Sequence, residues 1–558
     1  MSADSPTARP AGAPGGTKHP PLTKKVVWSL VGVLLTAFLS ALDQTVVSVA
    51  AYPIATGLDP DNGVQLMPWL ITTYMLGSSV TQPLYGKIAD LYGAKRIFVV
   101  ATGIFLVASA LCGASQTIGQ LIAFRVVQGI GAGGLYSVAL ILLARAVPPR
   151  ERAKFQGMAG LIIALATVTG PLIGGYLTGD HSFLGIDTSW RWIFYINLPI
   201  GIVGIAMVIS LLDLEPVRRG SHRVDYPGAL LIMAGSTLVL LTCNWGGDRY
   251  AWSDPLIIAL GAGGLVLLLV FVWWESRARE PLMPLRVFRE RTVAVASPML
   301  FVVGFALMGA ITYAALYLQL VRGYSSTATG LRLMPMILGI LIASIGSGIV
   351  ISNRNGRYKV FPVCGTLCAA TGLVVLGQLS TDSSYGLLSA GLFLLGLGLG
   401  LLMQVLVLAV QNASPEADLG SATTTAGFSR TMGQSFGGAV FGAILANQFN
   451  DARAAGGDAR LSAPGLKPED LPGLPGPASS TGMGMFVDSL DVVFVSAGVV
   501  MLAAFVLSWF LKEMELREID DLEAIASELD DPTLYEAVAE EDEADRPAPA
   551  VHGAPARE

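Results

Sequence analysis

Charged residues are scarce in this sequence. Asp, Glu, Lys and Arg make up 14% of the 558 residues, whereas soluble domains contain about 25%. Hydrophobic residues account for 53%, and the mean hydropathy is +0.60. This composition excludes an ordinary soluble fold and indicates a polytopic membrane protein, in which the 64 glycines suit close helix packing. The formal charge of −6 says little about partners, because it is mostly a matter of one tail.

Histidine and cysteine are also rare, with four residues of each. Cys364 and Cys368 are four positions apart on one helix face, but no His or second Cys pair lies nearby, so we interpret them as packing residues and not as metal ligands. No basic, aromatic-interleaved stretch suggests nucleic acid. No nucleophile–base set or phosphate-binding loop is present, and neither tail is large enough for an output domain. We therefore expect no enzyme, no metal and no cofactor.

Long apolar runs dominate what is present. Residues 1–25 are rich in Pro, Gly, Ala and Thr and are predicted to be disordered. The first apolar run is too long for a signal peptide and lacks a clear cleavage site. Fourteen runs follow, each long enough to span a core of about 30 Å. The predicted spans are 26–51, 65–86, 97–115, 118–145, 154–178, 191–212, 227–245, 255–275, 292–321, 331–352, 359–379, 385–411, 419–448 and 487–511.

The runs divide as six, two and six. The predicted segments are a six-helix bundle at 26–212, two additional helices with basic linkers at 213–291, a second bundle at 292–511 with an external loop at 450–486, and an acidic cytoplasmic tail at 512–558. Lys and Arg in the predicted inner loops outnumber those in the outer loops by about three to one, which predicts that both termini are cytoplasmic. The loop 412–418 does not follow this pattern: it should be cytoplasmic, but it carries two acids and no base.

One carboxylate lies deep in an apolar run. Asp43 is about 26 Å from Val26, at 1.5 Å per helical residue. An ionised Asp at this depth is costly, so we expect it to face a polar cavity or a partner and not lipid. A buried Asp that merely accepts hydrogen bonds between helices is the alternative. No other carboxylate, and no His, lies in the middle of a predicted span.

Arg125 is the predicted partner of Asp43. It lies about 11 Å from the outer end of its span, and Asp43 also falls in the outer half of its own, so the two residues share a similar depth. A neighbouring guanidinium favours the charged carboxylate, whereas desolvation disfavours it. If cavity opening changes that balance, Asp43 loads and releases a proton during a transport cycle. A permanent ion pair that holds the two helices together is the alternative.

Two glycine-containing stretches are predicted to act in conformational gating. In the first, the glycines permit a tight reversal, and the acid accepts from nearby bases or a helix N-terminus and so latches one conformation. Its residues are Gly86, Asp90, Gly93, Lys95 and Arg96. A weak repeat of this pattern occurs at Ile349–Lys359, with Asn353 in place of the acid, and suggests that the two halves arose by duplication. A simple positive-inside turn is the alternative.

The second stretch, Ala166–Gly175, lies in the fifth span. Its glycines let helices approach closely, and its proline kinks the helix. The gating residues here are Gly170, Pro171, Gly174 and Gly175. A generic packing kink is the alternative.

These stretches resemble the major facilitator superfamily and, within it, the fourteen-helix drug:proton antiporters, over about residues 26–512. The resemblance rests on Gly86–Arg96, Leu121–Gly133 and Ala166–Gly175, and for the fourteen-helix subgroup on Leu42–Val47, Trp190–Gly201 and Tyr317–Ser325. Ala166 stands where the pattern usually has Gly. The resemblance implies an all-α membrane protein with 14 transmembrane helices, in which two six-helix bundles face a central cavity and two further helices lie between them.

In the second half, Arg430 is the only charge in the middle of a span. Some relatives that export dications carry a further acid in this half, so its absence favours monovalent cationic, neutral or zwitterionic lipophilic compounds. Polar, aromatic and Met residues in the spans expected to line the cavity are the candidate substrate contacts. They are Tyr74, Met75, Tyr313, Tyr317, Met403, Gln404, Phe428, Arg430 and Gln434. For each of them, a lipid-facing or packing role is the alternative.

The resulting hypothesis is a monomeric antiporter of the plasma membrane that exports small amphipathic or lipophilic compounds in exchange for protons. Its partners are the small-molecule substrate, protons and the lipid bilayer, and the proton gradient is its source of energy. Three alternatives stay open. They are a dedicated exporter of an endogenous metabolite, a proton-coupled importer, which the Gly170–Gly175 stretch disfavours, and a membrane-bound enzyme or sensor.

Overall fold

The computed structural model describes residues 23–60, 63–178, 182–183, 186–187, 189–212, 225–247, 249–353, 357–455, 461, 468–474 and 477–513. The predicted disordered N-terminus up to residue 22, most of the first basic linker and the acidic tail from residue 514 lie outside the described residues.

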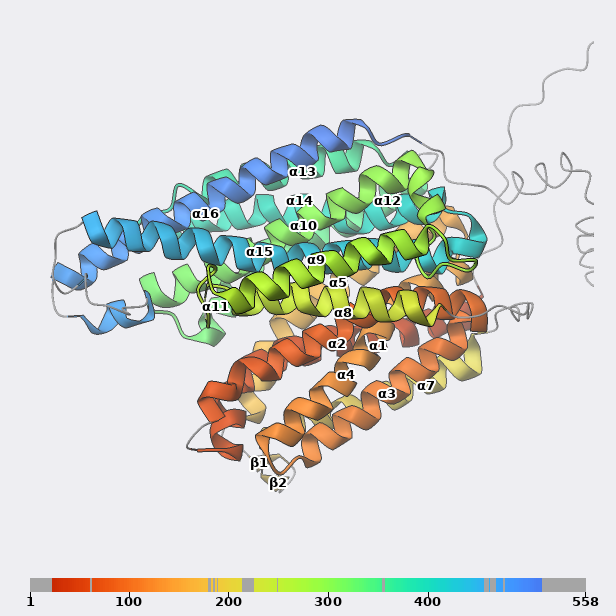
Figure 1. The fold of residues 1–558 in the computed structure, drawn as a ribbon, viewed down its shortest axis with the longest axis horizontal. Helices are drawn as coiled ribbons and strands as arrows, with labels where there is room; N and C mark the ends of the chain where they lie inside the picture. The colour runs from red at the N-terminus through yellow and green to blue at the C-terminus, as the bar shows by residue number, and fades with distance from the viewer. Residues whose placement is uncertain are drawn as a thin grey trace, which may run out of the picture.

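Helices make up nearly all of the described chain, and each of the fourteen predicted spans falls in a helix or a pair of consecutive helices (Figure 1). The α-helices are α1 Lys24–Leu58, α2 Gly63–Tyr92, α3 Ala94–Ala114, α4 Ile118–Ala146, α5 Pro149–Leu177, α6 Trp192–Tyr195, α7 Asn197–Leu211, α8 Tyr226–Trp245, α9 Pro255–Glu275, α10 Arg291–Leu316, α11 Ser326–Arg332, α12 Met334–Asn353, α13 Val360–Leu376, α14 Tyr385–Ala413, α15 Leu419–Ala455 and α16 Pro477–Trp509. Short elements complete the fold: β1 Ser182–Phe183 paired with β2 Ile186–Asp187, η1 Leu285–Arg289, η2 Tyr317–Val321, η3 Glu416–Asp418 and η4 Pro468–Gly473.

Polar residues at the ends of the apolar runs start several of these helices. The side chains of Thr23, Thr117, Asp225 and Ser384 each accept a backbone N–H in the first turn of the helix that follows. Such caps satisfy donors that have no partner within the helix. They explain why the helix starts follow the sequence pattern closely.

Ten segments of the described chain are long and apolar enough to cross a membrane, by length and composition. The helices α2, α5 and α15 do not meet this criterion, although each has at least 29 residues. These three helices pack across the seam between the two halves of the molecule, where α2 contacts α15 and α5 contacts α12. Their lower hydropathy fits a position that faces other helices more than lipid.

The helices form two groups that lie side by side (Figure 1). In the first, α1, α2, α3, α4, α5 and α7 pack around the buried residues between α1 and α4. In the second, α10 and α12 to α16 share one large apolar core. The hairpin of α8 and α9 lies along the seam, and α8 touches α2 on one side and α15 on the other.

The helices differ from the predicted spans chiefly near the second half's long external loop. The loop predicted at 450–486 is shorter, because α15 continues to Ala455 and α16 already begins at Pro477. Proline is tolerated in the first turn of a helix, where its missing N–H would have no partner. The Gly- and Pro-rich composition therefore predicted a loop that is too long. The predicted span 487–511 held Asp488 and Asp491 only at its start, whereas the early start of α16 places them well inside the helix, so Asp43 is no longer the only acid in the middle of a long apolar helix.

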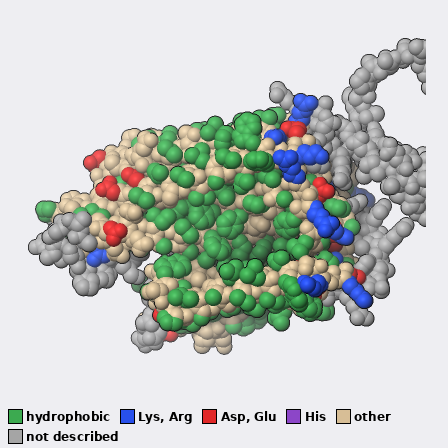
Figure 2. Space-filling view, turned by 45° about the horizontal axis from the view of Figure 1, so that its top comes forward, with side chains coloured by type: hydrophobic (Ala, Val, Ile, Leu, Met, Phe, Trp, Pro, Cys, Tyr) green, Lys and Arg blue, Asp and Glu red, His purple; other side chains and the backbone are tan. Residues whose placement is uncertain are grey.

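Charge is distributed unevenly along the molecule. Figure 2 shows Lys and Arg gathered at one end of the helices, Asp and Glu at both ends, and an apolar belt between the ends. We call the end with Lys and Arg the basic end; α1 begins there, and α4 and α16 finish there. Exposed residues such as Lys24, Arg277 and Arg289 belong to segments at this end.

Candidate functional site

A buried ion pair joins α1 to α4. Asp43 Oδ2 lies 2.5 Å from Arg125 Nη1, and both residues are about 1% exposed. Arg125 Nε donates to the backbone carbonyl of Leu70 on α2 at 3.0 Å, and its guanidinium lies 4.1 Å from the ring centroid of Tyr74. The structure therefore brings together the two residues that were predicted to share a depth, and it adds α2 as a third wall of the site.

Two amide side chains complete the surroundings of the carboxylate. Asp43 Oδ1 accepts from Gln128 Nε2 at 2.9 Å and from Asn197 Nδ2 at 3.0 Å. Both amides also donate to Ser109 Oγ on α3, which in turn donates to the carbonyl of Phe194 at 2.9 Å. All these contacts to Asp43 are donated to it, which is the pattern that an ionised carboxylate requires.

Sequence reasoning assigned no role to three of these residues. Gln128 and Asn197 lie in stretches that carry the family resemblance, and the signal that was available is an amide inside an apolar run. Ser109 offers no such signal, because Ser is common in membrane helices. Among the described atoms, Asn197 Oδ1 is buried without a partner, so the amide makes hydrogen bonds only through its nitrogen.

The fifth helix packs against α1 next to this site. A Cβ atom at Gly170 would collide with the side chain of Thr45, two residues beyond Asp43. Thr45 Oγ1 donates to the carbonyl of Ala166 at 3.0 Å. Pro171 lies inside α5, and Gly174 is buried. Gly175 has open space where a Cβ would stand. Of the predicted gating glycines in α5, Gly170 is thus the one that brings its helix directly to the Asp43 turn.

A second carboxylate joins the two halves at the basic end. Asp90, near the end of α2, accepts from the backbone N–H groups of Gly420 and Ser421 at 3.0 Å each, in the first turn of α15. Arg145 of α4 pairs with it at 2.8 Å. A carboxylate at a helix N-terminus is stabilised by the free N–H groups and by the helix dipole. The contact expected between Asp90 and a base or a helix N-terminus is therefore present in this structure, and its role as a latch stays a prediction.

The other residues of that stretch support the latch. Gly93 has φ of 90°, which lets the chain reverse between α2 and α3 without strain. Gly86 faces Gly420 and Thr424 of α15 so closely that a side chain would not fit. Lys95 Nζ donates to the carbonyls of Ile209 and Leu212 at the end of α7. No hydrogen bond or ion pair of Arg96 is among the described contacts.

A further contact at the basic end was not predicted. Gln156 Nε2 of α5 donates to Gln411 Oε1 of α14 at 2.6 Å, and Gln411 Nε2 donates to Thr423 Oγ1 of α15 at 3.2 Å and to the carbonyl of Leu140. Both glutamines are at most 2% exposed. Two buried amides thus tie the halves together beside Asp90. The basic end of the seam is closed.

The candidate substrate contacts are dispersed. Tyr74 belongs to the Asp43 site, and Tyr317 donates to the carbonyl of Ser380 at the far end of the second half. Tyr313 and Met403 are buried in the second half's core, and Phe428 packs against α2 and α8. Gln404 is 3% exposed, and its Oε1 has no partner among the described atoms. Met75 and Gln434 are half-buried, and Arg430 lies 5.1 Å from the ring centroid of Tyr136.

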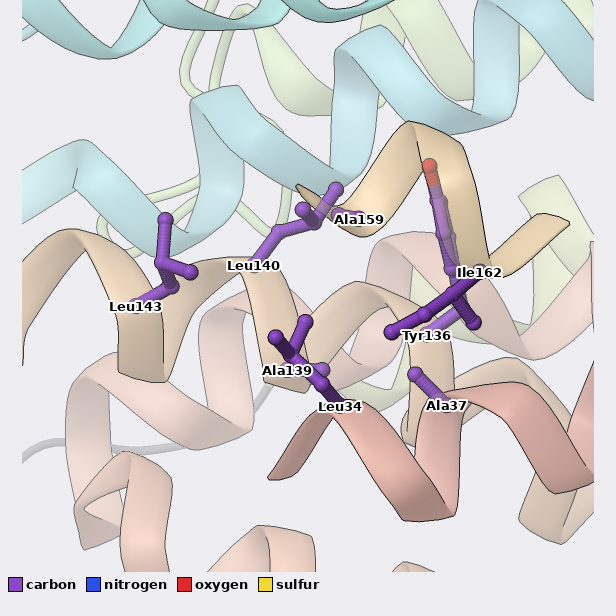
Figure 3. A pocket seen from close by; sticks show the side chains of 8 residues that line it. All are labelled: Leu34, Ala37, Tyr136, Ala139, Leu140, Leu143, Ala159 and Ile162. Atoms are coloured by element: carbon purple, nitrogen blue, oxygen red, sulfur yellow. The ribbon is translucent and has the colours of Figure 1, made fainter. Parts of the chain in front are cut away.

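An apolar hollow lies on the face of the first half that meets the second (Figure 3). It is formed by α1, α4 and α5, and its lining carries a single polar side-chain atom, the hydroxyl oxygen of Tyr136. The lining residues are Leu34, Ala37, Tyr136, Ala139, Leu140, Leu143, Ala159 and Ile162. Leu34, Leu140 and Ala159 are also part of the apolar core that extends into the second half. The hollow is therefore a recess in the seam and not a pocket on the outer surface.

Comparisons with known proteins agree on one family. The Major Facilitator Superfamily matches residues 33–438. An uncharacterised MFS-type transporter of Mycobacterium tuberculosis is 38% identical over 524 residues, which cover 92% of this chain and 73% of that protein. The multidrug transporter protein MdtP of Bacillus subtilis is 34% identical over 416 residues, covering 75% and 74%. The crystal structure of the proton:xylose symporter XylE superposes with a TM-score of 0.59 at 14% identity, covering 90% of this chain and 99% of that one.

The contact between Gly170 and Thr45 leads to a prediction about stability. Gly170→Ala should lower the free energy of unfolding by about 1–3 kcal/mol, because the added methyl group forces α5 away from α1. Gly175→Ala is the matched control on the same helix; there the methyl group meets open space. Thermal unfolding of the detergent-solubilised protein measures both. Equal melting temperatures for the two variants would show that the close approach at Gly170 is unimportant.

The buried amide of Asn197 leads to a second prediction. Asn197→Ala should destabilise the protein by about 1–3 kcal/mol, because Asp43 and Ser109 each lose a buried hydrogen-bond donor. Asn244→Ala serves as the control, since that exposed amide donates only to a carbonyl of its own helix. Denaturation followed by tryptophan fluorescence gives the difference. A melting temperature for Asn197→Ala within the range of the control would contradict the assigned contacts.

Proposed function

Because this protein belongs to the major facilitator superfamily, we propose that it exports small amphipathic or lipophilic compounds in exchange for protons. Proteins of this superfamily transport small molecules across membranes and are not enzymes, and several relatives are named as multidrug or efflux transporters. The proposal adds proton coupling, the outward direction and antiport to that family assignment.

The Asp43 site carries the proposal. Its carboxylate is about 1% exposed and receives hydrogen bonds from Arg125, Gln128 and Asn197. Adding a proton to Asp43 places an O–H among groups that all donate and leaves the charge of Arg125 without its partner. A buried charge that loses its partner costs about 3–5 kcal/mol. Protonation of Asp43 therefore favours a rearrangement of α1 against α4, and this is the step that couples a proton to movement.

The Asp90 contact supplies the second requirement of an antiporter. Transport by alternating access requires that the two halves separate at one end and close at the other. Separation at the basic end would break the hydrogen bonds of Asp90 to α15 and the bond between Gln156 and Gln411. This structure is closed at that end, and we assign it to the state in which the substrate path opens toward the opposite side.

Topology and energetics follow from the same proposal. We propose fourteen membrane-spanning segments in a six, two and six arrangement, with the basic end and both termini in the cytoplasm of a plasma-membrane monomer. The excess of Lys and Arg at one end supports this orientation. A proton that enters through such a protein gains about 2.3 kcal/mol per 100 mV of membrane potential, before any pH gradient is added.

The first test concerns Asp43. In proteoliposomes, Asp43→Asn should abolish efflux driven by a pH gradient, because the neutral amide cannot bind and release a proton. Asp488→Asn, which removes an exposed acid from the long helix α16, should transport like the unmodified protein. Dye accumulation measured with cationic, neutral and anionic amphipathic dyes gives the rates.

Normal proton-driven transport by Asp43→Asn would remove this residue from the mechanism. The same vesicles also give the direction of transport. Uptake of a dye together with protons would show that the protein imports and does not export. Preference for one compound over the whole dye panel would favour a dedicated metabolite exporter.

The second test concerns the latch. A cysteine introduced at Thr424, which is buried against Gly86, should react slowly with a membrane-permeant maleimide in a background without the four native cysteines. Asp90→Ala should raise the labelling rate about tenfold or more, because loss of the two backbone hydrogen bonds and of the one from Ser421 Oγ to Asp90 shifts the population toward the state open at the basic end. Asp382→Ala, at an exposed loop position, is the control. Unchanged labelling in Asp90→Ala would show that the latch does not hold this state.

A further inference from the structure

Within the part of the chain that the structure describes, Arg430 is a positive charge without a negative partner. It lies 11 residues into α15, or about 16 Å from the start of the helix, which is near the middle of a core of about 30 Å. The described ion pairs involve Arg125, Arg145 and Arg286, and none involves Arg430. Its guanidinium has one described contact, the ring of Tyr136 on α4. Arg430 is half-buried, and a cation–π contact recovers only part of what a charge loses when it is partly removed from water.

The surroundings of Arg430 show where a missing partner would sit. Tyr136 belongs to the first half, so the arginine side chain reaches across the seam. The same tyrosine lines the apolar hollow between α1, α4 and α5 (Figure 3). Thr431, the next residue, donates to Gln82 Oε1 of α2 at 3.3 Å and holds this turn of α15 against the first half. A cation is thus fixed at the edge of a recess whose lining is otherwise almost entirely hydrocarbon.

This arrangement fits one class of ligand better than the others. A guanidinium binds carboxylate and phosphate groups with paired hydrogen bonds, whereas a second cation at this position would be repelled. The hollow itself holds only about 10 Å³, the space of one water molecule, so it supplies an apolar wall for the rest of such a molecule and not a ready pocket. Charges inside membrane helices that face the interior mark substrate or ion pathways.

We propose that the transported compounds carry an acidic group, and that Arg430 binds this group while the apolar side chains around Tyr136 contact the apolar part. The substrate class is then an amphipathic organic anion or a zwitterion with an exposed carboxylate. This inference rests on the proposed export function. It narrows the sequence-based preference, which also included monovalent cations and neutral compounds.

The proton site does not compete for this ligand. Asp43 lies about 28 Å from the start of α1, whereas Arg430 lies about 16 Å from the start of α15, and both helices start at the basic end. Asp43 already has Arg125, Gln128 and Asn197 as partners. One arginine therefore serves the proton-binding carboxylate and the other serves the carboxylate of the substrate.

Binding of three fluorescent probes to the purified full-length protein in a neutral detergent tests the proposal. 1-Pyrenebutyrate, 1-pyrenebutyramide and 1-pyrenebutylamine share one apolar body and differ in charge. The carboxylate should bind about tenfold more tightly than the amide and the amine, as one well-placed charged hydrogen-bonding pair predicts. Equal or tighter binding of the amine or the amide to the unmodified protein would overturn the proposal without any variant.

Variants of Arg430 test whether this residue causes the preference for the carboxylate probe. Arg430→Gln should bind all three probes alike, and Arg430→Lys should keep part of the preference for the carboxylate. Arg289→Gln, which removes an exposed positive charge at the basic end, is the control for net charge. A preference for the carboxylate that survives in Arg430→Gln with an unchanged melting temperature would overturn the assignment to Arg430.

The result of the binding experiment can be interpreted separately from the test of proton-coupled export. Binding in detergent needs no proton gradient, so the charge preference of the unmodified protein is measured independently of its transport activity. Loss of transport in vesicles together with intact anion preference would therefore refute proton-coupled export and leave the binding site standing. The reverse result would refute the binding site alone.

Discussion

The cost of placing charge inside an apolar helix bundle is the constraint on which the first half depends. Asp43 and Arg125 are both about 1% exposed, and each would lose several kcal/mol of hydration without compensation. The fold compensates by bringing donors and acceptors from α2, α3, α4 and α7 to a single point on α1. Such a site is specific because removal of any one partner leaves a buried charge or a buried polar atom unsatisfied. The same property makes the site responsive to a proton, since one hydrogen added to Asp43 changes the hydrogen bonding of every neighbouring side chain.

Much of the fold and the pairing of Asp43 with Arg125 were predictable from the sequence. Because a helix rises 1.5 Å per residue, the depths of Asp43 and Arg125 followed from their positions, and the structure places them in contact. The all-helical superfamily fold is confirmed by the family match and by the solved structures. The fourteen-span topology and the division of the chain stay predictions. The start of α16 was wrong by ten residues, because composition alone does not separate a Pro-containing first turn from a loop.

Other parts of the site were beyond sequence reasoning. Asn197 reaches Asp43 from 154 residues away, and Gln411 reaches Gln156 from 255 away. Such pairs depend on how α7 and α14 rotate about their axes, and the nearly uniform apolar character of these helices gives no periodic signal from which to read that rotation. Arg430 was recognisable as an isolated charge, but its contact with Tyr136 required the packing of α15 on α4. For the same reason, a polar residue in an apolar run is a sound pointer to a site and a poor guide to its partner.

One helix passes through all three of the sites described above. The fourth helix carries Arg125 at the proton site, Tyr136 beside Arg430, and Arg145 at the Asp90 latch. These positions are 11 and 9 residues apart, or about 16 and 14 Å along a continuous helix of 29 residues. A helix of this length, packed on both α2 and α3, moves as a rigid element. A small tilt of α4 that relieves an unpaired Arg125 therefore also displaces Tyr136 and Arg145. In the proposed mechanism, coupling of proton, substrate and latch then needs no chain of intermediate residues, because all three would act on the same rigid body.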